Sequence, residues 1–237
     1  MRRAIQAVKP FLPVALKRRL IRAVPPRFYR LVDPDWHRRA VGGRWEELGR
    51  LQFDYVRSGG LEPQHYFLDV GCGSLRGGVH FIRYLEPGHY FGIDKNPERL
   101  EAGRRVELPR YRLEHKRPVL EVIDDFQVAR LGQDFDYALA QSVFTHLSLE
   151  LVGLCIRNVA RALAPGGRFY ATFLEGGSGS TDVVDRSHLA FEKDPIYRHD
   201  PAALRLLAEE AGLSAQHVSD WGHPRGQAML VLSAPPS

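Results

Sequence analysis

The residues best suited to ligand chemistry lie in YFLDVGCGSLRGGVHF, residues 66–81, and shortly after it. Gly71 and Gly73 come directly after an apolar run and directly before a helical pattern. Glycines allow a sharp turn and a close approach of a ligand, and the start of the following helix offers free N–H donors. Asp94 ends the next apolar run, 21 residues after Gly73. A carboxylate at that place accepts both hydroxyls of an adenosine ribose, so the two signals predict a ligand that contains adenosine.

The spacing of the glycines separates two classes of adenosine ligand. A dinucleotide site requires G-x-G-x-x-G, and here Arg76 stands at the third glycine position. An arginine side chain fits poorly where a pyrophosphate and a helix crowd together. S-adenosylmethionine has no phosphate, so the turn favours it over NAD. For Arg76 itself three roles stay open, namely contact with the cofactor carboxylate, contact with the substrate, and a plain ion pair.

Alternating strand and helix patterns must position these residues. The predicted strands span residues 66–70, 89–93, 119–123, 135–140, 168–173, 214–219 and 227–232, and the predicted helices span 78–85, 97–105, 149–163 and 201–211. This alternation is typical of a parallel sheet covered on both faces. Only DWGHPRG, residues 220–226, separates the last two strands. Because that is too short for a crossover helix, these strands must pair antiparallel.

Four segments in this order carry a family resemblance. LDVGCGS, YFGIDKN, FDYALAQSVFTHL and ALAPGGRFYATF resemble the successive motifs of class I S-adenosylmethionine-dependent methyltransferases. The resemblance implies an α/β fold with a Rossmann-like seven-stranded sheet, an antiparallel terminal strand and, in this chain, an N-terminal helical extension. It also implies that S-adenosyl-L-methionine is the cosubstrate. The cofactor-binding residues that it implies are Asp69, Gly71, Gly73 and Ser74 near the methionine part, Asp94 and Asn96 near the ribose, Asp125 and Phe126 near the adenine, and Gln141 and Ser142 beside the methionine part and facing the substrate.

His146 is the candidate catalytic base. Methyl transfer from a sulfonium is an in-line displacement, in which a hydroxyl acceptor needs a base or a metal to take its proton. His146 follows the fourth predicted strand in QSVFTHLS, and an imidazole suits this task at neutral pH. The alternative is a histidine at a helix start that hydrogen-bonds the backbone.

Residues 174–199, LEGGSGSTDVVDRSHLAFEKDPIYRH, form a segment too long for a plain connector. We expect a lid or substrate wall here, with Glu175, Tyr197 and His199 joining Arg76 as substrate contacts. Acidic and histidine side chains in the segment suit Mg²⁺, namely those of Glu175, Asp182, Asp185, His188 and Glu192. Metal-dependent relatives, however, have Asp where this chain has Gln141 and Ser142. We therefore predict no metal site, and Mg²⁺ stays an open alternative.

The charge of the chain is unevenly distributed. Residues 1–30 hold nine of the 33 Lys and Arg residues and no acid, which leaves 24 basic against 28 acidic residues in the rest. We divide the chain into a basic N-terminal helical extension, residues 1–60, and a methyltransferase domain, residues 61–237. The basic segment suits an anionic membrane surface or a partner protein, or packs on its own domain. The acidic remainder argues against DNA and disfavours RNA as a substrate.

A substrate class follows only from resemblance. HRRAVGGRWEELGRLQ, residues 37–52, together with GCGSLRGG is similar to actinobacterial sugar and polysaccharide methyltransferases, including the 1-O-methyltransferases of mycobacterial methylmannose polysaccharide synthesis. This implies O-methylation of a hydroxyl on a small molecule or glycan, with Arg198 and Trp221 as further sugar-contacting side chains. Alternatives are an RNA methyltransferase that uses the basic arm, and a non-catalytic binding protein. A homodimer is compatible with either catalytic reading.

The cysteines and the hydropathy indicate the compartment. Cys72 and Cys155 are the only two cysteines, and they lack the spacing of a metal site. No apolar run reaches the length of a membrane span. We therefore expect reduced thiols in a cytoplasmic protein.

Overall fold

A computed structural model of the chain describes residues 35–177, 182–184 and 195–237. The chain divides into two compact units, Met1–Gly43 and Arg44–Ser237. In the first unit the described part contains helix α4, Trp36–Ala40. The basic segment 1–30 and much of the predicted lid lie outside the described residues. Among the described helices none combines the length and the apolar character needed to cross a membrane.

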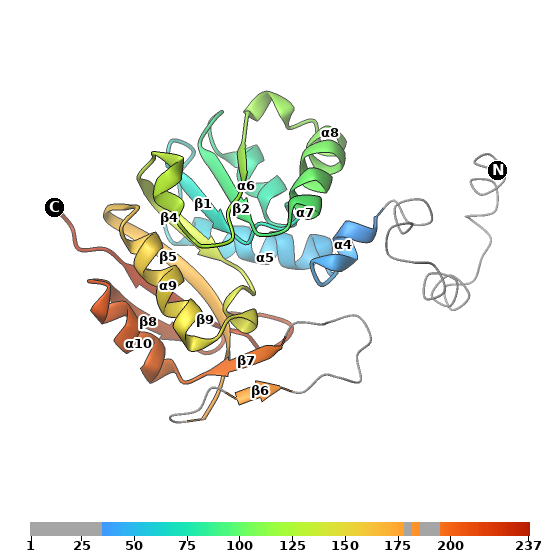
Figure 1. The fold of residues 1–237 in the computed structure, drawn as a ribbon. Helices are drawn as coiled ribbons and strands as arrows, with labels where there is room; N and C mark the ends of the chain where they lie inside the picture. Colours follow the sequence, from blue (N-terminus) through green and yellow to red (C-terminus); the bar gives the residue numbers. More distant parts are fainter. Residues whose placement is uncertain (1–34, 178–181, 185–194) are drawn as a thin grey trace, which may run out of the picture. The chain divides into compact units, whose positions relative to one another are not determined.

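The second unit is built on one large sheet (Figure 1). Its strands are β1 Phe67–Val70, β2 Tyr90–Asp94, β3 Val119–Val122, β4 Phe135–Ala140, β5 Leu163–Glu175, β8 Ser214–Val218 and β9 Ala228–Ser233. Strands β3, β2, β1, β4 and β5 lie side by side in parallel, and β9 pairs antiparallel with both β5 and β8. This arrangement confirms the predicted fold class, including the antiparallel terminal strand.

Side chains alternate between the two faces of the sheet, so each face has its own core. On β4, for example, Ala138 and Ala140 pack in one cluster and Leu139 in the other. Helices α9, Leu149–Ala160, and α10, Pro201–Glu210, cover the first face. Helices α5, Trp45–Ser58, α6, Gly78–Tyr84, α7, Pro97–Ala102, and α8, Leu108–Tyr111, cover the second. A π-helical turn, Gly103–Glu107, joins α7 to α8.

Several features differ from the sequence prediction. Strand β5 begins at Leu163 rather than at 168, and helix α9 ends at Ala160 rather than at 163. The Pro165-Gly166-Gly167 segment that indicated a helix stop continues as irregular extended backbone, with a register shift between Phe135 and Tyr137 of β4. In addition, β7, Ile196–His199, pairs with the end of β5, and β6, Asp182–Val184, pairs with β7. Helix α5, predicted as part of the N-terminal extension, lies in the unit of the sheet.

Candidate active site

The predicted cofactor residues gather at one edge of the sheet. Strands β1 to β4 run parallel, so the loops after them share the carboxyl edge, where ligands of open α/β sheets bind. The loops also contact one another. The Gly73 amide donates to Asp94 Oδ2 at 2.9 Å. A Cβ on Gly71 would lie 2.5 Å from Cγ2 of Val143, in the loop after β4. The loop after β1 therefore touches its neighbours on both sides.

Three of these loops place a non-glycine residue in the left-handed region. Leu75 after β1 has φ 73°, Phe126 after β3 has φ 58°, and Ser142 after β4 has φ 59°. This conformation costs about 1–2 kcal/mol for an L residue, and such outliers cluster at functional sites. These three residues therefore mark the same edge of the sheet as the candidate site. The sequence alone did not reveal this strain.

Asp69 is buried near the end of β1, and its pKa is raised well above the ordinary value of an aspartate. Its Oδ2 accepts a hydrogen bond of 2.6 Å from the Tyr90 hydroxyl, which comes from β2. Burial raises the pKa of Asp69 to about 7, with a smaller contribution from nearby Asp94, while the Tyr90 hydrogen bond and Arg76 act in the opposite direction. A cationic group beside Asp69 would favour its ionised form, as the predicted contact with the methionine part requires.

Asp94 organises the turn. Its Oδ2 accepts the amide of Gly73 and its Oδ1 accepts the amide of Asn96 at 2.8 Å. A carboxylate has about four acceptor positions, so two stay available for ribose hydroxyls. Asn96 caps helix α7 with its side-chain oxygen, which accepts the amides of Glu98 and Arg99. The remaining acceptor positions of Asp94 thus suit the hydroxyls of a ribose. The side-chain oxygen of Asn96, in contrast, is used to cap helix α7.

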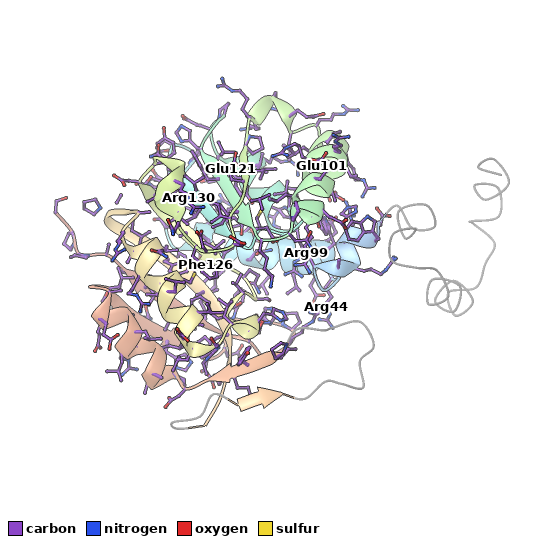
Figure 2. The ribbon with its side chains drawn as sticks, in the orientation of Figure 1. Arg44, Arg99, Glu101, Glu121, Phe126 and Arg130 are labelled. Atoms are coloured by element: carbon purple, nitrogen blue, oxygen red, sulfur yellow. The ribbon has the colours of Figure 1, made fainter. Side chains whose placement is uncertain are left out.

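Asp125 and Phe126, the predicted adenine residues, follow β3 (Figure 2 labels Phe126). Asp125 accepts the Gln127 amide at 3.1 Å and forms a half-exposed ion pair with Arg130 at 2.8 Å. Phe126 is half-buried and packs against the core on the α9 face. The loop after β3 therefore brings Phe126 to the carboxyl edge of the sheet, and the Asp125 carboxylate is paired with Arg130.

A buried polar network lies at the ends of β4 and β5. The Ser142 amide donates to Thr172 Oγ1 at 2.6 Å, and the hydroxyls of Ser142 and Thr172 donate to Gln227 Oε1 at 3.0 and 2.7 Å. The Gln141 amide group lies 3.1 Å from the Ser142 hydroxyl and 3.3 Å from His223 Nε2. Gln141 and Ser142 are thus brought together with side chains from the loop between β8 and β9.

The hydrogen bonds of His223 determine its tautomer. Its Nδ1 accepts the amides of Arg225 and Gln227 at 3.3 and 3.4 Å, so the proton of the neutral ring is on Nε2. Burial, together with Arg76, Arg225 and Arg44, lowers the pKa of His223 to about 4. Near neutral pH His223 is therefore an uncharged donor toward Gln141.

Arg76 is buried within the Gly-rich turn, with 7% of its surface exposed. Its pKa is lowered to about 10, first by burial and then by Arg225, while Asp69 acts in the opposite direction. Ser74, in the same turn, is fully buried. Arg76 therefore lies close to Asp69 and to the β8–β9 loop, and it is not a surface side chain.

His146 ends the 3₁₀ turn Phe144–His146 that follows the β4 loop. Its amide donates to the Val143 carbonyl at 2.9 Å, and its side chain is exposed. The turn lies directly after Ser142, so His146 is close in sequence to the site. This position is compatible with both roles considered for it, the base and the turn-stabilising histidine.

The described part of the predicted lid contributes mainly structural contacts. His199 is fully buried, its Nε2 lies 2.9 Å from the Phe144 carbonyl, and its ring stacks on that of Tyr197 at 6.3 Å. Glu175 Oε1 lies 2.6 Å from Nε2 of His217 on β8. Arg198 donates to the Glu175 carbonyl at 3.0 Å. Of the residues considered for Mg²⁺, Asp185, His188 and Glu192 lie outside the described residues.

Sequence reasoning missed the contribution of the terminal hairpin. His223, Arg225 and Gln227 belong to DWGHPRGQ, which the sequence pattern indicates only as a turn. Trp221, expected at the substrate, is buried against Tyr55 and donates from Nε1 to the Gln227 carbonyl at 2.8 Å. The sequence did contain one signal for them. Several polar residues lie close together in the turn of this hairpin, and the hairpin pairs with β5.

Comparisons with known proteins found a matching family model and similar folds. Residues 68–169 match the family model of a methyltransferase domain. Magnesium protoporphyrin IX methyltransferase from Synechocystis PCC 6803, solved with bound S-adenosylhomocysteine, is 16% identical over 88% of this chain and 97% of that chain, with a TM-score of 0.61. A SAM-bound amino pentose methyltransferase from Micromonospora echinaspora, involved in calicheamicin biosynthesis, is 18% identical over 82% of this chain and 93% of that chain, with a TM-score of 0.57. A glycopeptide N-methyltransferase in complex with S-adenosylmethionine is 14% identical over 79% and 94%, with a TM-score of 0.62.

The structural matches show the fold, which is that of Rossmann-like methyltransferases. The family match over residues 68–169 agrees with this fold, since its model describes a methyltransferase domain. The matched segment includes Asp69, the two glycines of the turn, Asp94 and Gln141, so it contains the loops that meet at the carboxyl edge.

Proposed function

We propose that the protein is an S-adenosylmethionine-dependent O-methyltransferase that acts on a hydroxyl of a small molecule or glycan. The observation that carries the proposal is the joined turn in which Gly73 and Asp94 are hydrogen-bonded beside buried Asp69. Asp94 would hold the ribose, Asp69 the ammonium of the methionine part, and Phe126 the adenine. The cosubstrate, when bound there, supplies an electrophilic methyl group.

The chain's own residues would orient the acceptor and remove its proton. Gln141 and Ser142, fixed by Thr172 and Gln227, form a rigid polar wall at the end of β4. A preorganised wall of this kind aligns a nucleophile and excludes water. We assign the proton acceptor to His146, because it follows this wall directly and is exposed to solvent, to which it can return the proton.

A sugar acceptor is the finer part of the proposal. It is supported by the resemblance to the 1-O-methyltransferase of mycobacterial methylmannose polysaccharide synthesis and by the amino pentose methyltransferase among the similar folds. Transfer of labelled methyl from S-adenosylmethionine to methylmannosides tests it. Turnover on RNA instead, lost on removal of residues 1–30, would favour the RNA alternative.

The cofactor and the base are tested separately. Calorimetric titration with S-adenosylhomocysteine should show stoichiometric binding, and absence of binding would reject the methyltransferase assignment. With an active acceptor in hand, His146→Gln should lower kcat by about 10²–10⁴ and remove the fall of kcat toward acidic pH, as loss of a general base does. A pH profile unchanged by His146→Gln would reject the base while leaving the enzyme class intact.

A further inference from the structure

Helix α5 carries one buried polar side chain, Gln52, on its apolar face. The other large side chains that this face buries are those of Trp45, Leu48, Phe53 and Val56. Gln52 is buried with them, with 3% of its surface exposed. Its amide offers two N–H donors and one acceptor oxygen, and neither end forms a hydrogen bond with a residue that the structure describes. A buried amide without partners is unfavourable, so its place on an apolar face requires a reason other than folding.

The amide of Gln52 is buried but not fully enclosed. Polar atoms that are both unpaired and fully enclosed occur in other side chains of the described part, such as Gln141 and His199, and the amide of Gln52 is not among them. Because this amide is also unpaired, its oxygen and nitrogen must share the small exposed part of the side chain. The amide therefore faces an opening that a ligand can reach.

That opening lies at the turn after β1. A Cβ on Gly77 would lie 2.5 Å from Cδ and Nε2 of Gln52 and 2.8 Å from its Oε1, so the whole amide lies against this glycine. One helical turn earlier, a Cβ on Gly49 would lie 2.4 Å from the Arg76 carbonyl oxygen. Any side chain at Gly77 would displace the amide. Helix α5 and the Gly-rich turn are thus fitted closely to each other at Gln52.

Helix α5 also contacts the other loop of this edge. The rings of Tyr55 and Trp221 lie 5.1 Å apart, and a Cβ on Gly222 would lie 4.0 Å from Cδ1 of Leu51. Trp221 and Gly222 belong to the β8–β9 loop, which the pairing of β9 with β5 places at the carboxyl edge. Helix α5 therefore borders this edge from the turn after β1 to the β8–β9 loop, with Gln52 between them.

The chemistry of the amide indicates the ligand group. Both ends of the Gln52 amide need a partner, so the ligand must offer an acceptor and a donor. The amino-acid end of S-adenosylmethionine offers a carboxylate and an ammonium. Asp69, at the start of the same turn, suits the ammonium and repels the carboxylate, which therefore requires a donor from another element. An amide provides this donor without adding a charge.

We propose that Gln52 binds the amino-acid end of the cosubstrate, with its NH₂ group donating to the carboxylate and its oxygen accepting from the ammonium. This inference rests on the proposed methyltransferase function, and it makes helix α5 part of the cosubstrate site. It also accounts for the unpaired amide, because a bound cosubstrate satisfies both of its ends.

The test is calorimetric titration of the full chain with S-adenosylhomocysteine and with 5′-methylthioadenosine, which keeps the ribose and the adenine but lacks the amino-acid end. Gln52→Leu should weaken S-adenosylhomocysteine about tenfold or more, as loss of a charge-assisted hydrogen bond does, and should change 5′-methylthioadenosine by less than about twofold. The matched control is Gln64→Leu, at an exposed glutamine before β1, which should leave both affinities unchanged.

Thermal unfolding separates binding from packing. Without ligand, the melting temperature of Gln52→Leu should equal or exceed that of the wild type, because an apolar side chain of similar size removes an unpaired buried amide. S-adenosylhomocysteine should then raise the melting temperature of the wild type more than that of the variant. If Gln52→Leu does not fold, Gln52→Met, which is unbranched like glutamine, carries the same expectations.

Three outcomes would overturn the inference. Equal losses for both nucleosides, together with a lower melting temperature without ligand, would make Gln52 a packing residue. Unchanged affinity of Gln52→Leu for S-adenosylhomocysteine would leave the amide to the acceptor substrate, while the enzyme class would stand. Absence of nucleoside binding to the wild type would reject the proposed function itself and, with it, the role of Gln52.

Discussion

Replacing Asp69 by asparagine should stabilise the unliganded protein at neutral and alkaline pH while it weakens cosubstrate binding. The asparagine side chain would keep an oxygen for the Tyr90 hydroxyl, which now donates to Asp69 at 2.6 Å, and it would carry no charge. The native carboxyl has a pKa raised from 3.8 to about 7 by burial. In the unfolded chain the same group titrates near 3.9.

The sign of the pH dependence follows from proton binding. Between about pH 4 and 7 the unfolded state has released the Asp69 proton and the folded state retains it, so the stability of the wild type decreases as pH rises. A shift of about three pKa units at 1.36 kcal/mol each gives an upper bound of about 4 kcal/mol, reached above pH 7. For a domain of this size that corresponds to roughly 10 °C in melting temperature. The asparagine variant lacks this contribution.

The assay is thermal unfolding of the unliganded wild type and of Asp69→Asn at half-unit steps from pH 5 to 8.5. The melting-temperature difference should grow in favour of the variant up to about pH 7 and then level off. Asp134→Asn, at an exposed position, is the matched control and should show no such trend. Calorimetry with S-adenosylhomocysteine at pH 7.5 should show at least tenfold weaker binding to Asp69→Asn, since a charged hydrogen bond is lost. A melting-temperature difference that is the same at pH 5 and pH 8 would refute the buried-acid reasoning.

Three further variants test the frame of the site. Asp94→Asn should weaken S-adenosylhomocysteine at least tenfold in calorimetry, because the carboxylate loses acceptor positions that it needs for two backbone amides and a ribose; unchanged affinity would place the ribose elsewhere. Gly71→Ala should lower the melting temperature, since its φ of 70° disfavours a side chain and its Cβ would lie 2.5 Å from Val143; adding Val143→Ala should recover only the steric part. His199→Phe should cost about 1–3 kcal/mol in a denaturant titration by orphaning the Phe144 carbonyl, and should leave nucleoside affinity unchanged. A large loss of affinity in His199→Phe would instead make His199 a ligand contact.

The strands could be predicted because their determinants are local. Apolar runs bounded by Gly, Pro and Asp identified β1, β2 and β4 to within a residue. The short loop 220–226 required an antiparallel hairpin, and the structure contains it. The true start of β5 was missed because its register with Phe135 and Tyr137 is a property of the assembled sheet, which no local pattern encodes.

Only some of the residues at the carboxyl edge could be placed there from the sequence. Asp69 and Asp94 lie at the ends of β1 and β2, and Gly73 lies in the turn after β1, so their place at this edge follows from the strand pattern alone. His223, Arg225 and Gln227 are different, because they reach this edge only through pairing. Strand β9 runs antiparallel to β5 with Ala228 opposite Phe173, so the residues before β9 lie at the carboxyl end of β5. A prediction of the strand order would have placed that loop at the site.

The histidines near this edge differ in whether they can take a proton, which constrains the chemistry. His223 has both ring nitrogens engaged and a pKa lowered to about 4, and His199 is buried against a carbonyl with its pKa also lowered. Neither is suited to act as a base near neutral pH, which agrees with the proposal that exposed His146 takes the proton.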